Sequence, residues 1–308
     1  MTYINLPGYN MQYGKKGWST LAYIILQIPK ILIKVNMENR WLRAFLKENP
    51  VDAVISDNRF GLYSKKVRTV FISHQLGVKS NLGGFLDRIT KYLNYSYIKR
   101  FNTCWVPDYN GQKAIAGTLS NPEKLPALKV LYIGGISRFE PCNEKDTSDE
   151  LLIILSGPEP QRSIFEKILL NDLNDYTGKV TFVRGLPGNA DSIEAPAGVT
   201  VYNHVPASKL NTLVCNAGMV ISRTGYTTVM DLFKLGKKSI LVPTPGQTEQ
   251  EYLARYLYDQ HLAYTASQKN FSLKKVLEAA KDFPFRQVHY SMEEYKTIIH
   301  DFVQALQS

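Results

Sequence analysis

Short apolar runs alternate with longer amphipathic stretches along most of the chain. Most of these runs are continuously hydrophobic rather than alternating, which is typical of parallel strands covered on both faces. The stretches between them have the period of helices, so the pattern indicates repeated βαβ units and an α/β fold. The expected strands are 51–56, 68–73, 103–107, 130–134, 151–157, 179–185, 199–204, 219–223, 239–243 and 262–266.

A polar, charged segment without an apolar period divides the chain at residues 137–150. We therefore expect a first domain over residues 1–137 and a second over residues 138–290. Apolar residues at helical spacing then predict an amphipathic C-terminal helix over residues 291–308.

The stretch between Trp18 and Lys47 also carries an apolar stripe at helical spacing, interspersed with basic residues. Two interpretations are open. The helix packs on the first sheet with its lysines in water, or it lies in a membrane interface. Both can hold together, because a packed helix can present a basic edge to anionic lipid. Pro29 is expected to kink or divide this helix.

The net charge of +10 is unevenly placed. Residues 1–110 hold 16 Lys and Arg against 6 Asp and Glu, whereas the rest of the chain is balanced. Such asymmetry indicates an anionic partner, such as a membrane surface, a phosphorylated substrate or a nucleic acid. Basic motifs interleaved with aromatic residues are lacking, so we expect an anionic membrane surface and no nucleic acid.

The three cysteines, Cys104, Cys142 and Cys215, are far apart and show neither a disulfide framework nor the spacing of metal ligands. No signal peptide opens the chain, and no uncharged apolar stretch of about 18 residues could span a bilayer. We therefore expect a cytoplasmic protein with reduced thiols, peripheral on the inner face of the cytoplasmic membrane.

The first chemistry-bearing junction follows the apolar run 219–223. The N–H groups in the first turn of a helix form an anion site, typically for phosphate. Gly225 would allow a tight turn and the close approach of a ligand, and Asp231 could accept hydrogen bonds from ribose hydroxyls. The alternative is a threonine N-cap and a solvated aspartate. The residues predicted to bind here are Arg223, Thr224, Gly225, Thr227, Thr228 and Asp231.

Three further strand-to-helix junctions carry similar chemistry at the carboxyl edge of the same predicted sheet, where open α/β sheets bind ligands. Two glycine- or proline-rich turns and one valine are expected to contact diphosphate, base and sugar. No Walker lysine motif and no GxGxxG occur there, which argues against a P-loop NTPase and a classical dinucleotide dehydrogenase. The candidate residues are Ser156, Gly157 and Arg162 for diphosphate, Val205 for the base, and Gln250 and Glu251 for sugar hydroxyls.

The stretch 220–257 resembles the donor-binding domain of glycosyltransferase family 28. Asp231 stands where the family has a ribose-binding Glu, and Glu251 stands where it has the second Gln of a pair. The resemblance implies a GT-B-like fold of two Rossmann-like domains facing across a cleft. It also implies an inverting, metal-independent enzyme with a UDP-sugar donor and no cofactor. The matching residues are Arg223, Thr224, Gly225, Thr228, Asp231, Gly236, Val242, Pro243, Gln250 and Glu251.

The first half is less closely similar to the acceptor domain of such a fold. Two βα units that this family places before the equivalent of residues 1–10 are missing, so the first domain is expected to be N-terminally incomplete. Polar residues at its strand ends include His74 and Asp57. We expect His74, or as second choice Asp57, to be the catalytic base that activates an acceptor hydroxyl.

The expected function is a hexosyltransferase of the cell envelope that moves a sugar, by expectation N-acetylglucosamine, from a UDP-sugar to a lipid-linked or glycan acceptor. No metal ligand is assigned, because the chain has no Asp-x-Asp motif. Two alternatives stay open: an enzyme resembling UDP-N-acetylglucosamine 2-epimerase, and a non-catalytic subunit that binds a nucleotide sugar.

Overall fold

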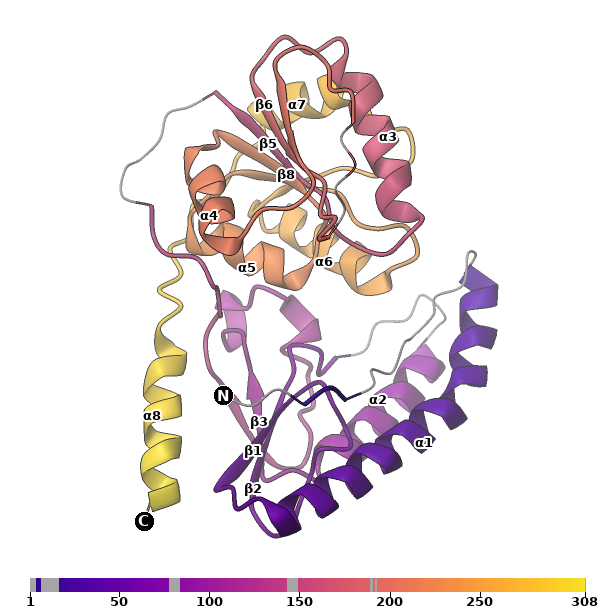
Figure 1. Cartoon of the computed structure of the whole chain (residues 1–308), viewed down its shortest axis with the longest axis vertical. Coiled ribbons are helices and arrows are strands. Elements are labelled where there is room, and N and C mark those ends of the chain that lie inside the picture. The colour runs from indigo at the N-terminus through magenta and orange to yellow at the C-terminus, as the bar shows by residue number, and fades with distance from the viewer. Residues whose placement is uncertain are drawn as a thin grey trace. The chain divides into compact units, whose positions relative to one another are not determined.

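The computed structural model divides the chain into two compact units (Figure 1). Unit 1 comprises Met1–Gly134 and Glu293–Ser308, and unit 2 comprises Gly135–Met292. The residues described are 4–6, 17–77, 84–142, 149–188, 191 and 193–307, with the side chains of 17–28 and 84–86 left out. Most of residues 1–10, the side chains in the first part of the predicted N-terminal stripe and the middle of the predicted linker therefore lie outside the described part of the chain.

The unit boundaries differ from the predicted ones. The change of unit falls after Gly134 rather than at residue 137, so the residues that follow belong to unit 2. The C-terminal helix, predicted as a separate segment, is part of unit 1.

Unit 1 is built on a parallel sheet with the strand order β1-β2-β3-β4. Its strands are β1 Ala53–Asp57, β2 Arg68–Ile72, β3 Thr103–Val106 and β4 Lys129–Tyr132. Its helices are α1 Gly17–Glu48, α2 Gly84–Ile98 and α8 Glu294–Gln307, with the short 3-10 turns η1 Gly111–Lys113 and η2 Gly117–Leu119.

The strands of unit 1 send alternate side chains to two different cores. Phe71 and Cys104 pack with Ile98 at the end of α2. Val70 and Trp105 instead join a cluster that receives apolar residues of α8. The sheet is therefore covered on both faces, as continuous apolar runs predict, and Figure 1 shows α2 and α8 on opposite sides of it.

Helix α1 continues through Pro29, so this proline does not divide the helix, and the alternative that it kinks the helix stays a prediction. Proline removes one backbone hydrogen bond from the helix that contains it. Val35 and Leu42 are buried, whereas Ile33 is 60% exposed and Met37 is 59% exposed. In its described part, α1 thus packs on the unit with one side and presents apolar side chains to water with another.

Unit 2 is built on a parallel sheet with the strand order β10-β9-β8-β5-β6-β7. Its strands are β5 Leu151–Ile154, β6 Val180–Val183, β7 Val199–Tyr202, β8 Met219–Ser222, β9 Ser239–Leu241 and β10 Tyr264–Thr265. Its helices are α3 Gln161–Leu173, α4 Ala207–Asn216, α5 Tyr226–Lys234, α6 Thr248–Asp259 and α7 Leu273–Lys281. Figure 1 shows α3 and α4 on opposite sides of the sheet.

The strand order of unit 2 reverses between β5 and β8. The chain runs outward from β5 through β6 to β7, and then returns to the other side of β5. A crevice opens at the carboxyl ends of the strands at such a switch point, and ligands of doubly wound sheets bind there. The loops after β5 and β8 are two of the predicted junctions, so topology places them together.

Each of the ten expected strands overlaps a strand of the structure, and every strand pairing among the described residues is parallel. The prediction of an α/β fold is therefore confirmed. Among the described residues, no helix is both long enough and apolar enough to cross a membrane.

Candidate functional site

A cavity of about 330 Å³ lies in unit 2 at the carboxyl ends of the strands. The ends of β5 and β6, the loop after β7 and the first turns of α4 and α5 form its walls. Four predicted binding residues line this donor cavity: Ser156, Val205, Thr228 and Asp231. The structure thus brings together residues from three of the four predicted junctions.

Asp231 lies in the second turn of α5 and is only 4% exposed. The Ser137 hydroxyl donates a hydrogen bond to its Oδ1 at 2.7 Å, and Arg138 Nε lies 3.4 Å from its Oδ2. Burial raises the pKa of Asp231, and the contacts with Ser137 and Arg138 oppose that shift. The carboxylate is therefore a buried acceptor at the cavity wall, held by two groups that a ligand could replace or join.

Helix α5 begins beside this cavity with no side-chain cap. Its N-cap is Gly225, which has no side chain that could accept a hydrogen bond from the first turn. Gly225 has φ −78° and ψ 135°, which any residue adopts, so the backbone of this turn does not itself require glycine. A Cβ there would meet only Thr228 Oγ1 at 3.8 Å. Open space in front of uncapped N–H groups suits a phosphate.

Two buried hydroxyls at neighbouring strand ends have no hydrogen-bond partner within the described residues. They belong to Thr224, after β8, and Thr244, after β9. Thr244 Oγ1 is also the only atom near a Cβ built on Gly157, at 3.7 Å. Gly157 has φ 103°, a conformation that favours glycine. Buried polar atoms without partners are rare, so these two hydroxyls indicate that a ligand could complete hydrogen bonding at the carboxyl ends of β8 and β9.

Arg223 was predicted as a phosphate-binding residue, but in the structure its side chain is buried and forms hydrogen bonds within unit 2. It is 1% exposed, and its Nη2 donates to Gln161 O at 2.9 Å and to Gln268 Oε1 at 2.6 Å. Its guanidinium also lies 4.5 Å from the centre of the Phe165 ring. Burial lowers the pKa of Arg223 to about 10. Arg223 therefore ties the loop after β8 to α3, and it is not part of the donor cavity wall.

Arg162 was predicted to be the charge partner of a diphosphate, and the structure differs here too. Its guanidinium pairs with Glu159 at 2.6 Å and with the buried Glu166. Glu166 pairs in turn with Arg184 at 2.7 Å. Since its charge is balanced by carboxylates, Arg162 stabilises the start of α3 rather than lining the cavity.

Gln250 and Glu251 shape the loop between β9 and α6. Gln250 Oε1 accepts a hydrogen bond from Thr244 N at 2.9 Å, and Glu251 Oε1 accepts one from Gly246 N at 3.0 Å. Neither residue lines the donor cavity. Thr227 is exposed on the first turn of α5 and is also outside it. Their predicted contacts with a ligand stay predictions.

Sequence reasoning missed the segment Ser137–Cys142. Arg138 and Phe139 line the donor cavity, and Phe139 is 3% exposed. The polar composition of this segment resembles a linker, and no periodicity reveals that it folds against the site. Its only sequence signal was Cys142.

Cys142 forms a disulfide with Cys215 of α4, so the prediction of three reduced, unpaired cysteines is wrong. The two residues are 73 positions apart, and their proximity depends on the tertiary fold. Glu140 N donates to Asn211 Oδ1 at 2.7 Å, and Asn211 Nδ2 donates to Glu140 O at 3.1 Å. These links fasten the cavity-lining segment to α4.

In unit 1, Asp57 and His74 lie at the same edge of the sheet. Asp57 ends β1, and its register partner Ile72 ends β2 two residues before His74. Asp57 is exposed and His74 is partly buried. Both candidates thus stand at carboxyl ends of strands, where polar residues of α/β proteins meet ligands. No group of three or more His, Cys, Asp and Glu residues that could hold a metal occurs in the described part of the chain.

Comparison with known proteins finds a family match in the second part of the chain. Residues 196–304 match the family described as the glycosyltransferase family 28 C-terminal domain. A UDP-N-acetylglucosamine–N-acetylmuramyl-(pentapeptide) pyrophosphoryl-undecaprenol N-acetylglucosamine transferase from a Sulfurihydrogenibium species is 27% identical over 160 residues, 49% of this chain and 44% of the relative. The protein of the same name from Desulforamulus reducens is 28% identical over 119 residues, 38% of this chain and 32% of the relative. The chain thus spans less than half the length of the curated relatives that it matches.

Solved glycosyltransferases share the fold. CalG4, the calicheamicin glycosyltransferase, aligns with a TM-score of 0.61 and 13% identity, over 95% of this chain and 82% of its own. MurG from Acinetobacter baumannii aligns with a TM-score of 0.51 and 14% identity, over 89% and 79%. The resemblance to family 28 and the GT-B-like fold, both predicted from the sequence, are confirmed.

Proposed function

We propose that this chain, whose residues 196–304 carry a family 28 C-terminal domain, is a glycosyltransferase that takes a hexose from a UDP-sugar. The observation that carries the proposal is the donor cavity, in which Asp231, Thr228 and Ser156 meet at the topological switch point of unit 2. The relatives with matching sequence are named as transferases of N-acetylglucosamine from its UDP derivative, so this sugar is the proposed donor.

The nucleotide is proposed to lie with its ribose on Asp231 and its diphosphate at the start of α5. Two vicinal hydroxyls can donate to one carboxylate, and the cavity wall offers that of Asp231. The uncapped N–H groups of α5 and the hydroxyl of Thr228 are fixed donors that would stabilise the negative charge on the diphosphate. Val205 would contact the base from the opposite wall.

The proposed reaction is a single displacement with inversion at the anomeric carbon. An acceptor hydroxyl attacks that carbon, the bond to the β-phosphate oxygen breaks, and UDP leaves with the electron pair. His74, or in its place Asp57, removes the hydroxyl proton. The α5 N-terminus would stabilise the charge on the leaving diphosphate, so the proposal includes neither a metal nor a cofactor.

The acceptor is proposed to be lipid-linked and presented at an anionic membrane surface on the cytoplasmic side. The first 110 residues carry the excess of positive charge. Helices α1 and α2 also expose apolar side chains, including Ile33, Met37 and Tyr92, the last 72% exposed. Exposed apolar residues among basic ones suit anionic lipid better than a nucleic acid, which we do not propose as a partner.

A transfer assay tests this function. Vesicles that contain N-acetylmuramyl-(pentapeptide) pyrophosphoryl-undecaprenol, the acceptor in the relatives' name, are incubated with the protein and labelled UDP-N-acetylglucosamine. Label is expected in the lipid fraction, with His74→Ala reducing the rate by about 100-fold or more. Full turnover by this variant would remove His74 from the proposed mechanism and leave Asp57.

The same assay separates the alternatives. An epimerase would convert UDP-N-acetylglucosamine in the absence of any acceptor. A non-catalytic subunit would bind UDP and leave the sugar nucleotide unchanged with every acceptor offered. Either result would replace the transferase proposal while keeping the donor cavity.

A further inference from the structure

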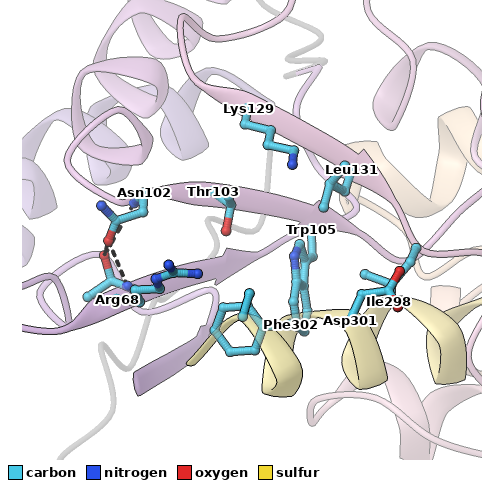
Figure 2. A pocket seen from close by; sticks show the side chains of 11 residues that line it. Arg68, Asn102, Thr103, Trp105, Lys129, Leu131, Ile298, Asp301 and Phe302 are labelled. Atoms are coloured by element: carbon cyan, nitrogen blue, oxygen red, sulfur yellow. Dashed lines mark hydrogen bonds between the residues drawn. The ribbon is translucent and has the colours of Figure 1, made fainter. Parts of the chain in front are cut away.

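Unit 1 contains a second cavity, of about 440 Å³, between its sheet and α8. Figure 2 shows that strands supply one wall and the C-terminal helix the other. Its volume is within the range of sites for small organic ligands. We call it the α8 cavity.

The α8 cavity lies at the amino ends of the strands. Arg68, Thr103 and Lys129 are the first residues of β2, β3 and β4, and all three line it. The candidate bases Asp57 and His74 instead follow the carboxyl ends of β1 and β2. The proposed acceptor chemistry and the α8 cavity therefore occupy opposite edges of the same sheet.

Strand register explains why these three residues share one face. Thr103 pairs with Lys129 across β3 and β4, and with Val70 across β2 and β3. Val70 belongs to the core under α8, and Arg68 precedes it by two positions, so both point to the same face. Figure 2 accordingly shows the side chains of Arg68, Thr103 and Lys129 on the side of the sheet that faces α8.

This end of the cavity carries positive charge from Arg68 and Lys129. Arg68 and Lys129 are exposed, and within the described residues neither has an ion pair or a hydrogen bond from its side chain. Thr103 Oγ1 lies between them, buried and without a partner in the described part of the chain. Two like charges beside an unsatisfied hydroxyl favour an anion that can accept from all three.

The middle of the cavity is apolar. Trp105 and Phe302 contact each other edge to face, with their ring centres 5.2 Å apart. Leu131 and Ile298 extend this wall toward the far end. Figure 2 shows Asp301 at that far end, away from Arg68 and Lys129, so an anionic group is favoured at one end of the cavity only.

From this arrangement we propose that the α8 cavity binds a single-chain amphiphile with one anionic head, a carboxylate or a phosphate. The head lies between Arg68, Lys129 and Thr103, and the chain lies along Trp105 and Phe302. The positive charges of Arg68 and Lys129 disfavour a cationic head at that end. The apolar wall beside them suits the hydrocarbon chain of the same ligand. The site is independent of the nucleotide-binding cavity in unit 2.

The test is calorimetric titration of the whole chain with octyl phosphate and octanoate below the concentrations at which they form micelles. Three matched ligands serve as controls. Octanol lacks the negative charge, octyltrimethylammonium carries a positive charge instead, and inorganic phosphate lacks the hydrocarbon chain. We expect saturable binding of one octyl phosphate or octanoate per chain, with octanol and inorganic phosphate weaker by about tenfold or more. Preference between the two anions tells a phosphate head from a carboxylate head.

Variants locate the binding. The double variant Arg68→Gln with Lys129→Gln should lower the affinity for octyl phosphate by about tenfold or more, because charge-assisted hydrogen bonds are lost. Lys66→Gln with Lys99→Gln changes exposed lysines of unit 1 outside the cavity and should leave affinity unchanged. Asp301→Asn should bind equally or more tightly. Thermal unfolding of each variant checks that it folds.

Three results would overturn the proposal: no saturable binding of either anion, equal binding of octanol, or equal loss in both double variants. UDP titrations of the same samples keep this outcome separate from failure of the donor cavity, since the two sites share no residue.

Discussion

At the scale of single residues, Asp231 carries most of the proposed recognition. It is the one acidic residue in the wall of the donor cavity, and it is held by Ser137 and Arg138. A hydrogen bond to a charged group contributes about 1.5–3 kcal/mol. Asp231→Asn is therefore expected to lower the affinity for UDP by ~10- to 100-fold in a calorimetric titration.

The matched control for this prediction is Asp259→Asn, which removes an exposed carboxylate at the end of α6. It should bind UDP like the unchanged protein. If both variants bind equally well, Asp231 does not hold the nucleotide.

Cys104 gives a residue-scale prediction about pH. Burial raises its pKa from 9.0 to about 12, so the folded chain keeps the thiol proton where the unfolded chain loses it. The folded state then binds more protons, and the contribution of Cys104 to stability is complete below pH 9.0 and is lost as pH rises toward 12. Free energies of unfolding measured over this window should fall less steeply in Cys104→Ala than in the unchanged chain.

Thiol counting with a chromogenic disulfide reagent checks the same cysteine. Without reductant, the folded chain should show no reactive thiol, since Cys104 is buried and the other two are paired. Unfolding should reveal one thiol, and reduction of the unfolded chain all three. Three thiols in the unfolded, unreduced protein would contradict the disulfide.

Residue identity alone did not decide the roles of the arginines. Arg162 and Arg223 follow strands in loops typical of phosphate binding, so the sequence predicted a ligand for both. Their actual partners, Glu166 and Gln268 among them, come from other turns or other elements, and a local pattern cannot reveal such contacts. Asp231 and Thr228 both line the cavity because they lie on a single helix beside one strand end, and their contacts with a nucleotide stay predictions.

At the scale of elements, the start of α5 is the proposed phosphate site. Gly225→Ala should leave stability within about 0.5 kcal/mol, because its backbone conformation is ordinary and the added Cβ meets nothing closer than 3.8 Å. The same methyl group would stand in front of the helix N-terminus, so UDP affinity should fall.

Gly236→Ala is the matched control. Gly236 ends the same helix region with φ 62°, so alanine should cost about 1 kcal/mol of stability while UDP affinity is kept. Thermal unfolding and UDP titration should therefore separate the two variants. Gly225→Ala should keep its stability and lose UDP affinity, whereas Gly236→Ala should lose stability and keep UDP affinity. Unchanged affinity in Gly225→Ala would place the phosphate elsewhere.

The disulfide between Cys142 and Cys215 joins the cavity-lining segment to α4. Cys142→Ser with Cys215→Ser opens a covalent loop and should lower stability by about 2–4 kcal/mol. UDP should bind more weakly, because Ser137 and Arg138 beside Asp231 lose their covalent attachment to α4. Reductant should reproduce both effects in the unchanged chain and have none on the double variant. Equal UDP affinity in all these samples would show that the segment is positioned without the disulfide.

Elements were the most predictable part of the fold. A strand buried on both faces must be apolar at every position, so Leu151–Ile154 and its counterparts are visible in the sequence. The pairing of residues 73 positions apart and the return of α8 to unit 1 depend on tertiary packing, which no local period encodes.

At the scale of the whole molecule, the uneven charge predicts membrane attachment. The protein should sediment with vesicles that contain phosphatidylglycerol, less with phosphatidylcholine alone, and less again as salt rises, because screening weakens attraction between surface charges. Sedimentation that depends on neither lipid charge nor salt would contradict this part of the proposal.

The proposed transferase depends on a uridine nucleotide bound to unit 2 through Asp231, and the decisive experiment is calorimetric titration of UDP. UDP-N-acetylglucosamine, GDP and ADP are titrated alongside, and all four are repeated with Asp231→Ala. We predict one UDP per chain, weaker GDP and ADP, and loss of UDP binding in the variant. If no nucleotide binds, or if UDP still binds after the loss of Asp231, then unit 2 does not hold a uridine nucleotide in this way.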